Sequence, residues 1–274
     1  MTSSSVWQRT HGSSRINWTQ AMITRRLVLQ AAALPLLSVP RKTLRFVFSR
    51  PYDNPRTQWL IKVYQDVCAL SDLGFEFIDV PPKRATAMVQ SGLADGELGR
   101  TFGYLDYFPG LIRLSEPNNA VNFCVYGASA AARFDGMEQL RQLRQRCECR
   151  RGILELEALL RVHVDEEQRS LIDDVGQGLR KLQLGRTDLY FDVQEAVDDY
   201  LRFDDCHEAL PRTPAIRELG KVLTTTGHCY LNPAQAEHAP RMAEALAQLK
   251  HNGTVARYLQ QSLQEYQQRC RHRL

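Results

Sequence analysis

The chain has 274 residues and a mass of 31.3 kDa, a length that predicts about two domains. Hydrophobic residues make up 43% and charged residues 24%, which is typical of a folded globular protein and excludes a disordered one. The mean hydropathy of −0.37 excludes a protein with many membrane spans.

The formal charge of +4 comes from the first 40 residues, which contain four arginines and no acidic residue. Removing those four leaves 31 basic residues, equal in number to the 31 acidic residues. The body of the protein is therefore neutral. A neutral body without a basic stripe argues against nucleic acid as a partner.

An apolar run over residues 27–37 follows Arg25 and Arg26. It is too short to span a bilayer and lacks acidic residues, as in the hydrophobic region of a signal peptide. The two arginines also resemble a twin-arginine export signal, and an ordinary secretory leader is the alternative. We therefore expect residues 1–42 to be a leader, translation to start at Met22, and the mature protein to be periplasmic.

Seven cysteines suit an oxidising compartment without resembling a disulfide framework, and their odd number leaves at least one thiol free. Cys147 and Cys149 are separated by a single residue, whereas zinc ligands are usually separated by two to four and need further ligands nearby. We expect buried structural cysteines here, and neither a metal nor another cofactor.

Strand-like and helix-like segments alternate along the body, which predicts an α/β fold. The patterns predict strands at 44–49, 75–80, 94–98, 121–126, 146–150, 170–175, 188–191 and 228–231. They predict helices through Trp59 and Val67, after Pro82, near 137–145, 153–163, 176–183 and 193–201, and twice more near the C-terminus. The stretch from 211 to 214 is expected to be irregular.

Six short motifs follow one another along this pattern. They are Pro51-Tyr52 after the first strand, Leu73–Phe77, Ser91–Asp95, Ser115–Pro117, Gly185–Asp192 and Leu249–Thr254. In this order and spacing, the chain resembles the extracellular solute-binding proteins of family 3, the type II periplasmic binding proteins. The resemblance covers roughly residues 43–266.

This resemblance implies an α/β fold of two lobes joined by two crossover strands, with the ligand in the cleft between them. Lobe one would comprise residues 43–120 and 226–274, and lobe two residues 121–225. The hinges would lie near 119–122 and 225–227.

Ligands of open α/β sheets bind beyond the carboxyl ends of strands, so candidate contacts should follow strands. Tyr52 follows the first strand, where the resemblance implies an aromatic cover for the ligand; a tyrosine in a turn is the alternative. Arg84, in the first turn of the second helix, would face either the cleft or solvent. Glu97 and Arg100 bracket the end of the third strand, and Arg100 would offer a bidentate guanidinium to a ligand carboxylate.

In lobe two, Arg151 occupies the place of the family's Arg-Gly-Ser/Thr motif, where the start of a helix offers N–H groups to an anion. Asp192 matches the aspartate that pairs with a ligand amino group in amino-acid-binding members; a helix N-cap is the alternative. Arg100 and Asp192 are expected to face each other across the cleft. Two departures from the family pattern weaken the amino-acid interpretation. Ile153 stands where the family's Arg-Gly-Ser/Thr motif has a hydroxyl residue. Amino-acid-binding members also usually carry a Thr-x-x-Arg motif after the third strand, whereas no arginine stands three residues after Thr101.

The resemblance implies a monomeric periplasmic receptor that passes a small polar solute, amino acid-like or an organic acid, to the permease of an ABC-type importer. A ligand-sensing domain that acts with a signalling protein is one alternative. A cleft enzyme such as a cyclic-acid dehydratase, using Glu97 or Asp192 as acid or base, is another. P-loop, GxSxG, HExxH and GxGxxG motifs are all absent, so we expect no enzyme.

Overall fold

The structure is a computed structural model that describes residues 41–274, except 131, 204–205, 207–209, 211–212 and 272–274. The expected leader and start codon therefore fall almost wholly outside the described residues, as does part of the stretch expected to be irregular. Within the described part of the chain, no helix is long and apolar enough to cross a membrane.

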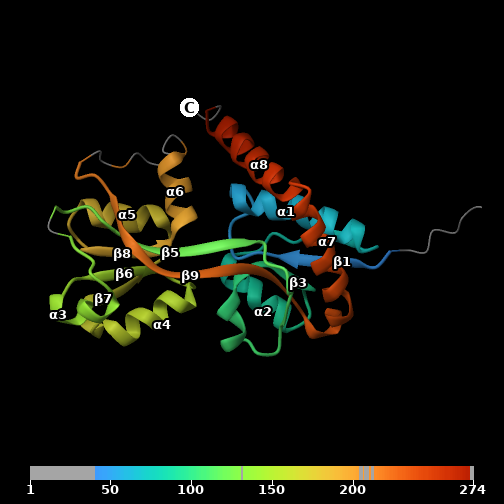
Figure 1. The fold of residues 1–274 in the computed structure, drawn as a ribbon, viewed down its shortest axis with the longest axis horizontal. Coiled ribbons are helices and arrows are strands. Elements are labelled where there is room, and N and C mark those ends of the chain that lie inside the picture. Colours follow the sequence, from blue (N-terminus) through green and yellow to red (C-terminus); the bar gives the residue numbers. More distant parts are fainter. Residues whose placement is uncertain (1–40, 131, 204–205, 207–209, 211–212, 272–274) are drawn as a thin grey trace, which may run out of the picture. The chain divides into compact units, whose positions relative to one another are not determined.

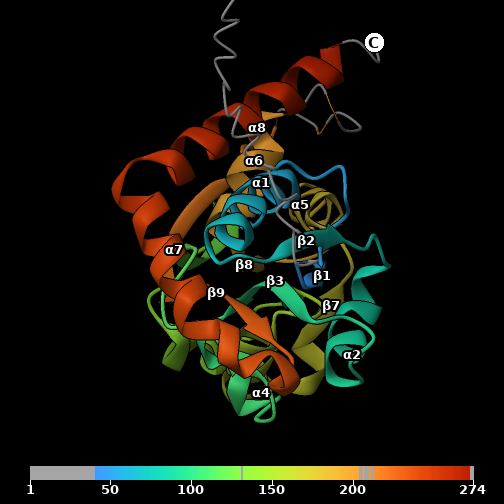
Figure 2. The same cartoon turned by 90° about the vertical axis from the view of Figure 1, so that its right-hand side faces the viewer.

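The first lobe is built from both ends of the described chain (Figure 1). Its elements are β1 (Thr43–Val47), α1 (Pro55–Leu70), β2 (Gly74–Phe77), α2 (Ala85–Gln90), β3 (Gly96–Thr101), β4 (Ile112–Arg113), α7 (Ala239–His251) and α8 (Thr254–Arg271). β1 pairs in parallel with β2 and β3. Helices α1, α7 and α8 cover one face of these strands and α2 covers the other, as Figure 2 also shows.

The second lobe repeats this arrangement with residues from the middle of the chain. Its elements are α3 (Leu140–Leu143), β6 (Cys147–Arg150), α4 (Leu154–His163), β7 (Arg169–Ile172), α5 (Val175–Gln183), β8 (Leu189–Val193) and α6 (Gln194–Arg202). β6 pairs in parallel with β7 and β8. The fold is therefore mixed α/β with two parallel sheet regions.

Two long strands, β5 (Asn119–Gly127) and β9 (Arg217–Leu231), join the lobes into one sheet of order β2-β1-β3-β9-β5-β8-β6-β7. They pair antiparallel from Asn119 opposite Gly227 to Gly127 opposite Arg217, with register shifts between Phe123 and Cys124 and between Val125 and Tyr126. Beyond Gly227, β9 pairs with β3 of the first lobe, while β5 pairs with β8 of the second.

The strands of the second lobe bury both faces, and alternate residues enter different cores. Phe123, Val125 and Phe191 pack with α3 and α4 on one face. Cys124, Tyr126 and Tyr190 pack with α5 and α6 on the other. This alternation is the period of two that a strand imposes on its side chains. It explains why these strands are apolar throughout, as is usual for sheets covered by helices on both sides.

Most predicted strands and helices are found within a few residues of their expected positions. The final strand predicted at 228–231 is present, but its predicted start was wrong, because β9 begins eleven residues earlier, at Arg217. The earlier part of β9 is mostly exposed or half-exposed, whereas its last five residues are buried. Only the buried end therefore carries the apolar signal of a strand.

One disulfide, Cys206–Cys270, links the region after α6 in the second lobe to α8 in the first. Cys68, Cys124, Cys147, Cys149 and Cys229 are free and buried. Cys147 and Cys149 both lie in β6 and pack into one hydrophobic core. No metal-binding cluster of histidine, cysteine or acidic side chains occurs among the described residues.

We predict that replacing Cys206 and Cys270 together with serine lowers the free energy of unfolding by about 2–4 kcal/mol, because the bridge closes a long loop in the unfolded chain. Its two cysteines are 64 residues apart in sequence. Denaturant titration with and without reductant measures the loss. Reductant should destabilise the wild type and leave the double variant unchanged. Equal stability of oxidised and reduced wild type would contradict the prediction.

His228 is a buried titratable group directly after Gly227, where β9 changes partners. Its Nδ1 lies 2.8 Å from the carbonyl oxygen of Leu114, and its Nε2 lies 2.8 Å from the hydroxyl of Thr226. Burial lowers the pKa of His228, and this outweighs the bond to the Leu114 carbonyl, which raises it. The folded protein therefore favours the neutral ring.

Because the pKa of His228 is lower in the folded than in the unfolded state, its contribution to stability is present above the usual histidine pKa of about 6.5 and is lost as pH falls further. We predict that the free energy of unfolding declines below about pH 6.5. His228→Gln should show a shallower decline between pH 7 and 5.5. Denaturant titrations at several pH values measure this, and parallel pH profiles for the two proteins would refute it.

Candidate functional site

A cleft of about 1820 Å³ lies between the lobes. It is lined by the segments that follow β1, β6 and β7, by the end of β3, by the start of β5 and by α6. In parallel sheet regions the carboxyl ends of the strands lie at one edge, and this edge is where ligands of such folds bind. The cleft exceeds the usual 300–1,000 Å³ of a small-molecule site, so a small solute would fill only part of it.

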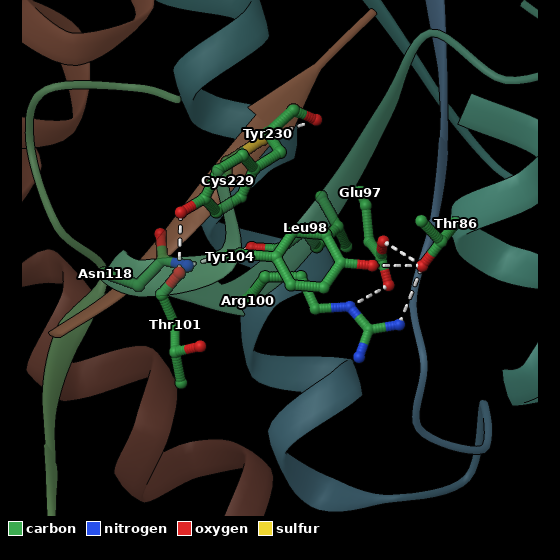
Figure 3. A network of polar contacts seen from close by, with 9 residues as sticks. All are labelled: Thr86, Glu97, Leu98, Arg100, Thr101, Tyr104, Asn118, Cys229 and Tyr230. Carbon is green, nitrogen blue, oxygen red and sulfur yellow. Dashed lines mark hydrogen bonds and ion pairs between the residues drawn. The ribbon is translucent and has the colours of Figure 1, made fainter. Parts of the chain in front are cut away.

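The wall of the first lobe contains a polar network around Arg100, drawn in Figure 3. The Arg100 Nε donates to Glu97 at 2.7 Å, and Nη2 donates to the Thr86 hydroxyl at 3.0 Å. The guanidinium also lies 4.8 Å from the ring centroid of Tyr104. Glu97 is fully buried, and its burial raises its pKa although Arg100 and Thr86 act against the shift. Arg100 lines the cleft, and its guanidinium is held in place by Glu97 and Thr86.

The same network continues to the strands beneath it. The Asn118 amide donates to the Leu98 carbonyl at 2.8 Å, and its oxygen accepts from Tyr64 at 2.7 Å. The Tyr230 hydroxyl donates to the Thr101 carbonyl at 2.6 Å. Figure 3 shows Leu98, Thr101, Asn118 and Tyr230 in the same view as Arg100. These contacts hold Leu98 and Thr101, on either side of Arg100 in the chain, to the core of the first lobe.

The wall of the second lobe is organised by an ion pair between Arg150, at the end of β6, and Asp192, in β8. The Arg150 Nη2 and Nε lie 2.8 and 3.0 Å from the two oxygens of Asp192. The carboxylate also accepts from the Tyr190 hydroxyl and from the Val193 backbone N–H. Burial opposes the charge on Arg150, but Asp192 raises its pKa above the usual value. Arg150 lines the cleft, whereas Asp192 lies behind it.

Several contacts join the lobes across the cleft. Arg56, in the first turn of α1, forms two hydrogen bonds with Asp199 of α6, the shorter at 2.7 Å. Thr101 donates to Glu155, and Lys83 lies 3.7 Å from Asp173. Side chains of both lobes are thus already in contact while the cleft between them remains wide.

The structure brings two of the six sequence-predicted residues to the cleft. Arg100 and Arg151 line it, and Arg151 lies 3.2 Å from Asp173. Tyr52 and Arg84 are exposed and do not line it, and the Tyr52 ring instead lies 5.8 Å from that of Phe77.

Glu97 and Asp192 lie one layer deeper, each engaged by an arginine that lines the cleft. The prediction that Arg100 and Asp192 face each other across the cleft was therefore wrong, because Arg150 covers the carboxylate. The alternative role of Asp192 as a helix N-cap was also wrong, since Val193 occupies that position.

Sequence reasoning missed five arginines that line the cleft: Arg50, Arg56, Arg150, Arg180 and Arg186. In the sequence, Arg50 and Arg56 are close to the predicted site residue Tyr52, and Arg150 is adjacent to the predicted site residue Arg151. Arg50 follows β1 and Arg150 ends β6, and this position at the carboxyl end of a strand is the signal that would have selected those two.

No protein-family model matches this sequence. An uncharacterized protein of Shewanella oneidensis is 27% identical over 240 residues, which cover 81% of this chain and 86% of that protein. A histidine kinase sensor domain with similarity to periplasmic binding proteins has a TM-score of 0.66 and 15% identity, over 81% of this chain and 96% of that chain.

An amino acid ABC transporter substrate-binding protein of Streptococcus pneumoniae, bound to L-arginine, has a TM-score of 0.62 and 12% identity, over 82% of this chain and 95% of that chain. The chain therefore has the two-lobe type II periplasmic binding protein fold, and the predicted fold class and resemblance are confirmed.

We predict that Arg150→Ala lowers the free energy of unfolding by about 3–5 kcal/mol, because it leaves the buried Asp192 carboxylate without its counter-ion. Arg151→Ala is the matched control, since the Arg151 and Asp173 side chains are 49% and 65% exposed. An exposed pair of this kind is worth about 0–1 kcal/mol. Denaturant titration compares the two variants. Equal losses would mean that Asp192 does not depend on Arg150.

Proposed function

We propose that this protein is a periplasmic receptor that closes on a small polar solute and delivers it to the membrane permease of an ABC-type importer. The observation that carries the proposal is the cleft itself, which is lined by charged side chains from both lobes. A ligand that contacts both walls stabilises the closed arrangement of two lobes, and only then can a partner distinguish loaded from empty protein.

The proposed boundaries keep residues 43–120 and 226–274 in lobe one and residues 121–225 in lobe two. The proposed hinges at 119–122 and 225–227 are supported by strand pairing, because Asn119 lies opposite Gly227 and Asn122 opposite Thr224. Bending at paired segments would move the lobes without breaking either core. We also propose that the protein acts as a monomer and reaches the periplasm through its N-terminal leader.

A sensory role is the second candidate. The similarity to a histidine kinase sensor domain supports this role. The chain is also similar to a substrate-binding protein of an ABC transporter, so one fold serves both sensing and transport. Reconstitution with the candidate membrane partners separates the roles. Loaded protein should stimulate ATP hydrolysis by an importer in the first case and change autophosphorylation of a kinase in the second.

A catalytic role has less support. The two carboxyl groups considered for it, Glu97 and Asp192, are held by Arg100 and Arg150 and do not line the cleft. Neither is in position to exchange a proton with a bound molecule.

We predict that a ligand at 100 times its dissociation constant stabilises the protein by about 2.7 kcal/mol, because it binds only the folded state. A thermal-shift screen of amino acids, polyamines, organic acids and sugars identifies the ligand. Small-angle scattering of the purified protein with the ligand should then show a smaller radius of gyration. An unchanged radius across a saturating titration would contradict closure.

A further inference from the structure

Arg50 differs from the other half-buried arginines of the cleft. It follows β1, lines the cleft and lies 5.9 Å from the ring centroid of Phe48. Within the part of the chain that the structure describes, its guanidinium makes no hydrogen bond and no ion pair. A half-buried guanidinium without a counter-ion is unfavourable unless a bound ligand supplies hydrogen-bond acceptors and negative charge.

Two other half-buried arginines of the cleft each have an acidic partner. Arg56 pairs with Asp199 at 2.7 Å, and Arg100 pairs with Glu97 at 2.7 Å. These arginines serve the structure of the lobes or the contact between them. Arg50 has no such structural use, so its charge is available to a ligand.

The surroundings of Arg50 already disfavour its positive charge. Burial and the nearby guanidinium of Arg150 lower the pKa of Arg50 to about 10. Glu195 and Asp192 act in the opposite direction but are engaged elsewhere. Asp192 pairs with Arg150, and Glu195 accepts a hydrogen bond from Asn119 at 3.3 Å. An anion between the two guanidinium groups would relieve both the repulsion and the desolvation.

Arg150 can hold a second partner. Its Nε and Nη2 bond to Asp192, while Nη1 makes no hydrogen bond within the described residues. A guanidinium has five N–H donors in a fixed plane, so the pair with Asp192 leaves one edge unused. Asp192 also fixes the orientation of that plane.

We propose that the cleft binds a small anion whose carboxylate or phosphate oxygens are held between Arg50 of the first lobe and Arg150 of the second. This inference rests on the proposed solute-binding function. The ligand would lie across the two lobes and supply the counter-charge that Arg50 lacks. No free ammonium group is required, because the carboxylate expected to receive one, Asp192, is already paired.

The experiment is a thermal-shift and calorimetric titration of the purified protein at fixed pH and ionic strength. The probes are inorganic phosphate, sulfate, acetate, succinate, citrate, glutamate, arginine, putrescine and glucose. Anions should stabilise the protein, and putrescine and glucose should not. Comparing the affinities of the carboxylates with that of phosphate identifies the preferred oxyanion. Comparing the affinity of glutamate with that of succinate measures any contribution of an ammonium group.

Arg50→Gln should weaken binding of the best anion by about 30-fold or more, because it removes one side of a desolvated charge contact. Arg50→Lys should restore part of the affinity, since it keeps the charge but not the planar pair of donors. Arg133→Gln is the control. It removes one positive charge from an exposed position outside the cleft and should bind as the wild type does.

The outcomes separate this inference from the proposed function. If a neutral or cationic probe binds and Arg50→Gln does not change its affinity, the anion site is refuted while solute binding stands. Equal losses in Arg50→Gln and Arg133→Gln would also refute it, because the effect would then come from net charge alone. Failure of every probe to stabilise the wild type would count against both.

Discussion

The antiparallel pairing of β5 with β9 is the constraint on which the rest of the structure depends. These strands are paired over the whole of β5, from Asn119 opposite Gly227 to Gly127 opposite Arg217, with two register shifts between those ends. Each strand also pairs with a strand of a different lobe: β9 pairs with β3 of the first lobe, and β5 pairs with β8 of the second. The pairing thus fixes which strand ends meet at the cleft. It brings Arg100, at the end of β3, and Arg150, at the end of β6, to opposite walls although they are distant in sequence.

The motifs that carry the sequence resemblance turn out to be structural more than ligand-binding. Asp95 accepts a hydrogen bond from the backbone N–H of Arg45, and Asp188 accepts one from that of Arg146. Each aspartate therefore ties its own strand to the neighbouring one at the same relative place in the two lobes. Another pair of motifs meets directly, since Lys250 bonds to Glu116. Such tertiary contacts explain why the order of motifs predicted the fold well.

The site was less predictable than the fold because its determinants are pairwise contacts between distant segments. Asp192 carries the family's motif, and nothing within residues 185–192 reveals that Arg150, 42 positions earlier, covers it. That contact depends on β6 and β8 being adjacent, which the strand pattern does not specify. The first part of β9 was missed for another reason. Its residues are exposed or half-exposed, so it lacks the apolar signal by which a buried strand is recognised in a sequence.

The distribution of contacts between the lobes indicates which of them hold most firmly. The Cys206–Cys270 disulfide and the Arg56–Asp199 pair, whose side chains are 14% and 16% exposed, join α1 and α8 to the region of α6. The Lys83–Asp173 contact is 79% and 65% exposed, and exposed pairs contribute little. Separation of the lobes therefore costs least near Lys83 and most near the disulfide. A ligand held between Arg50 and Arg150 would oppose that separation by adding a partly buried charge contact where the protein supplies none.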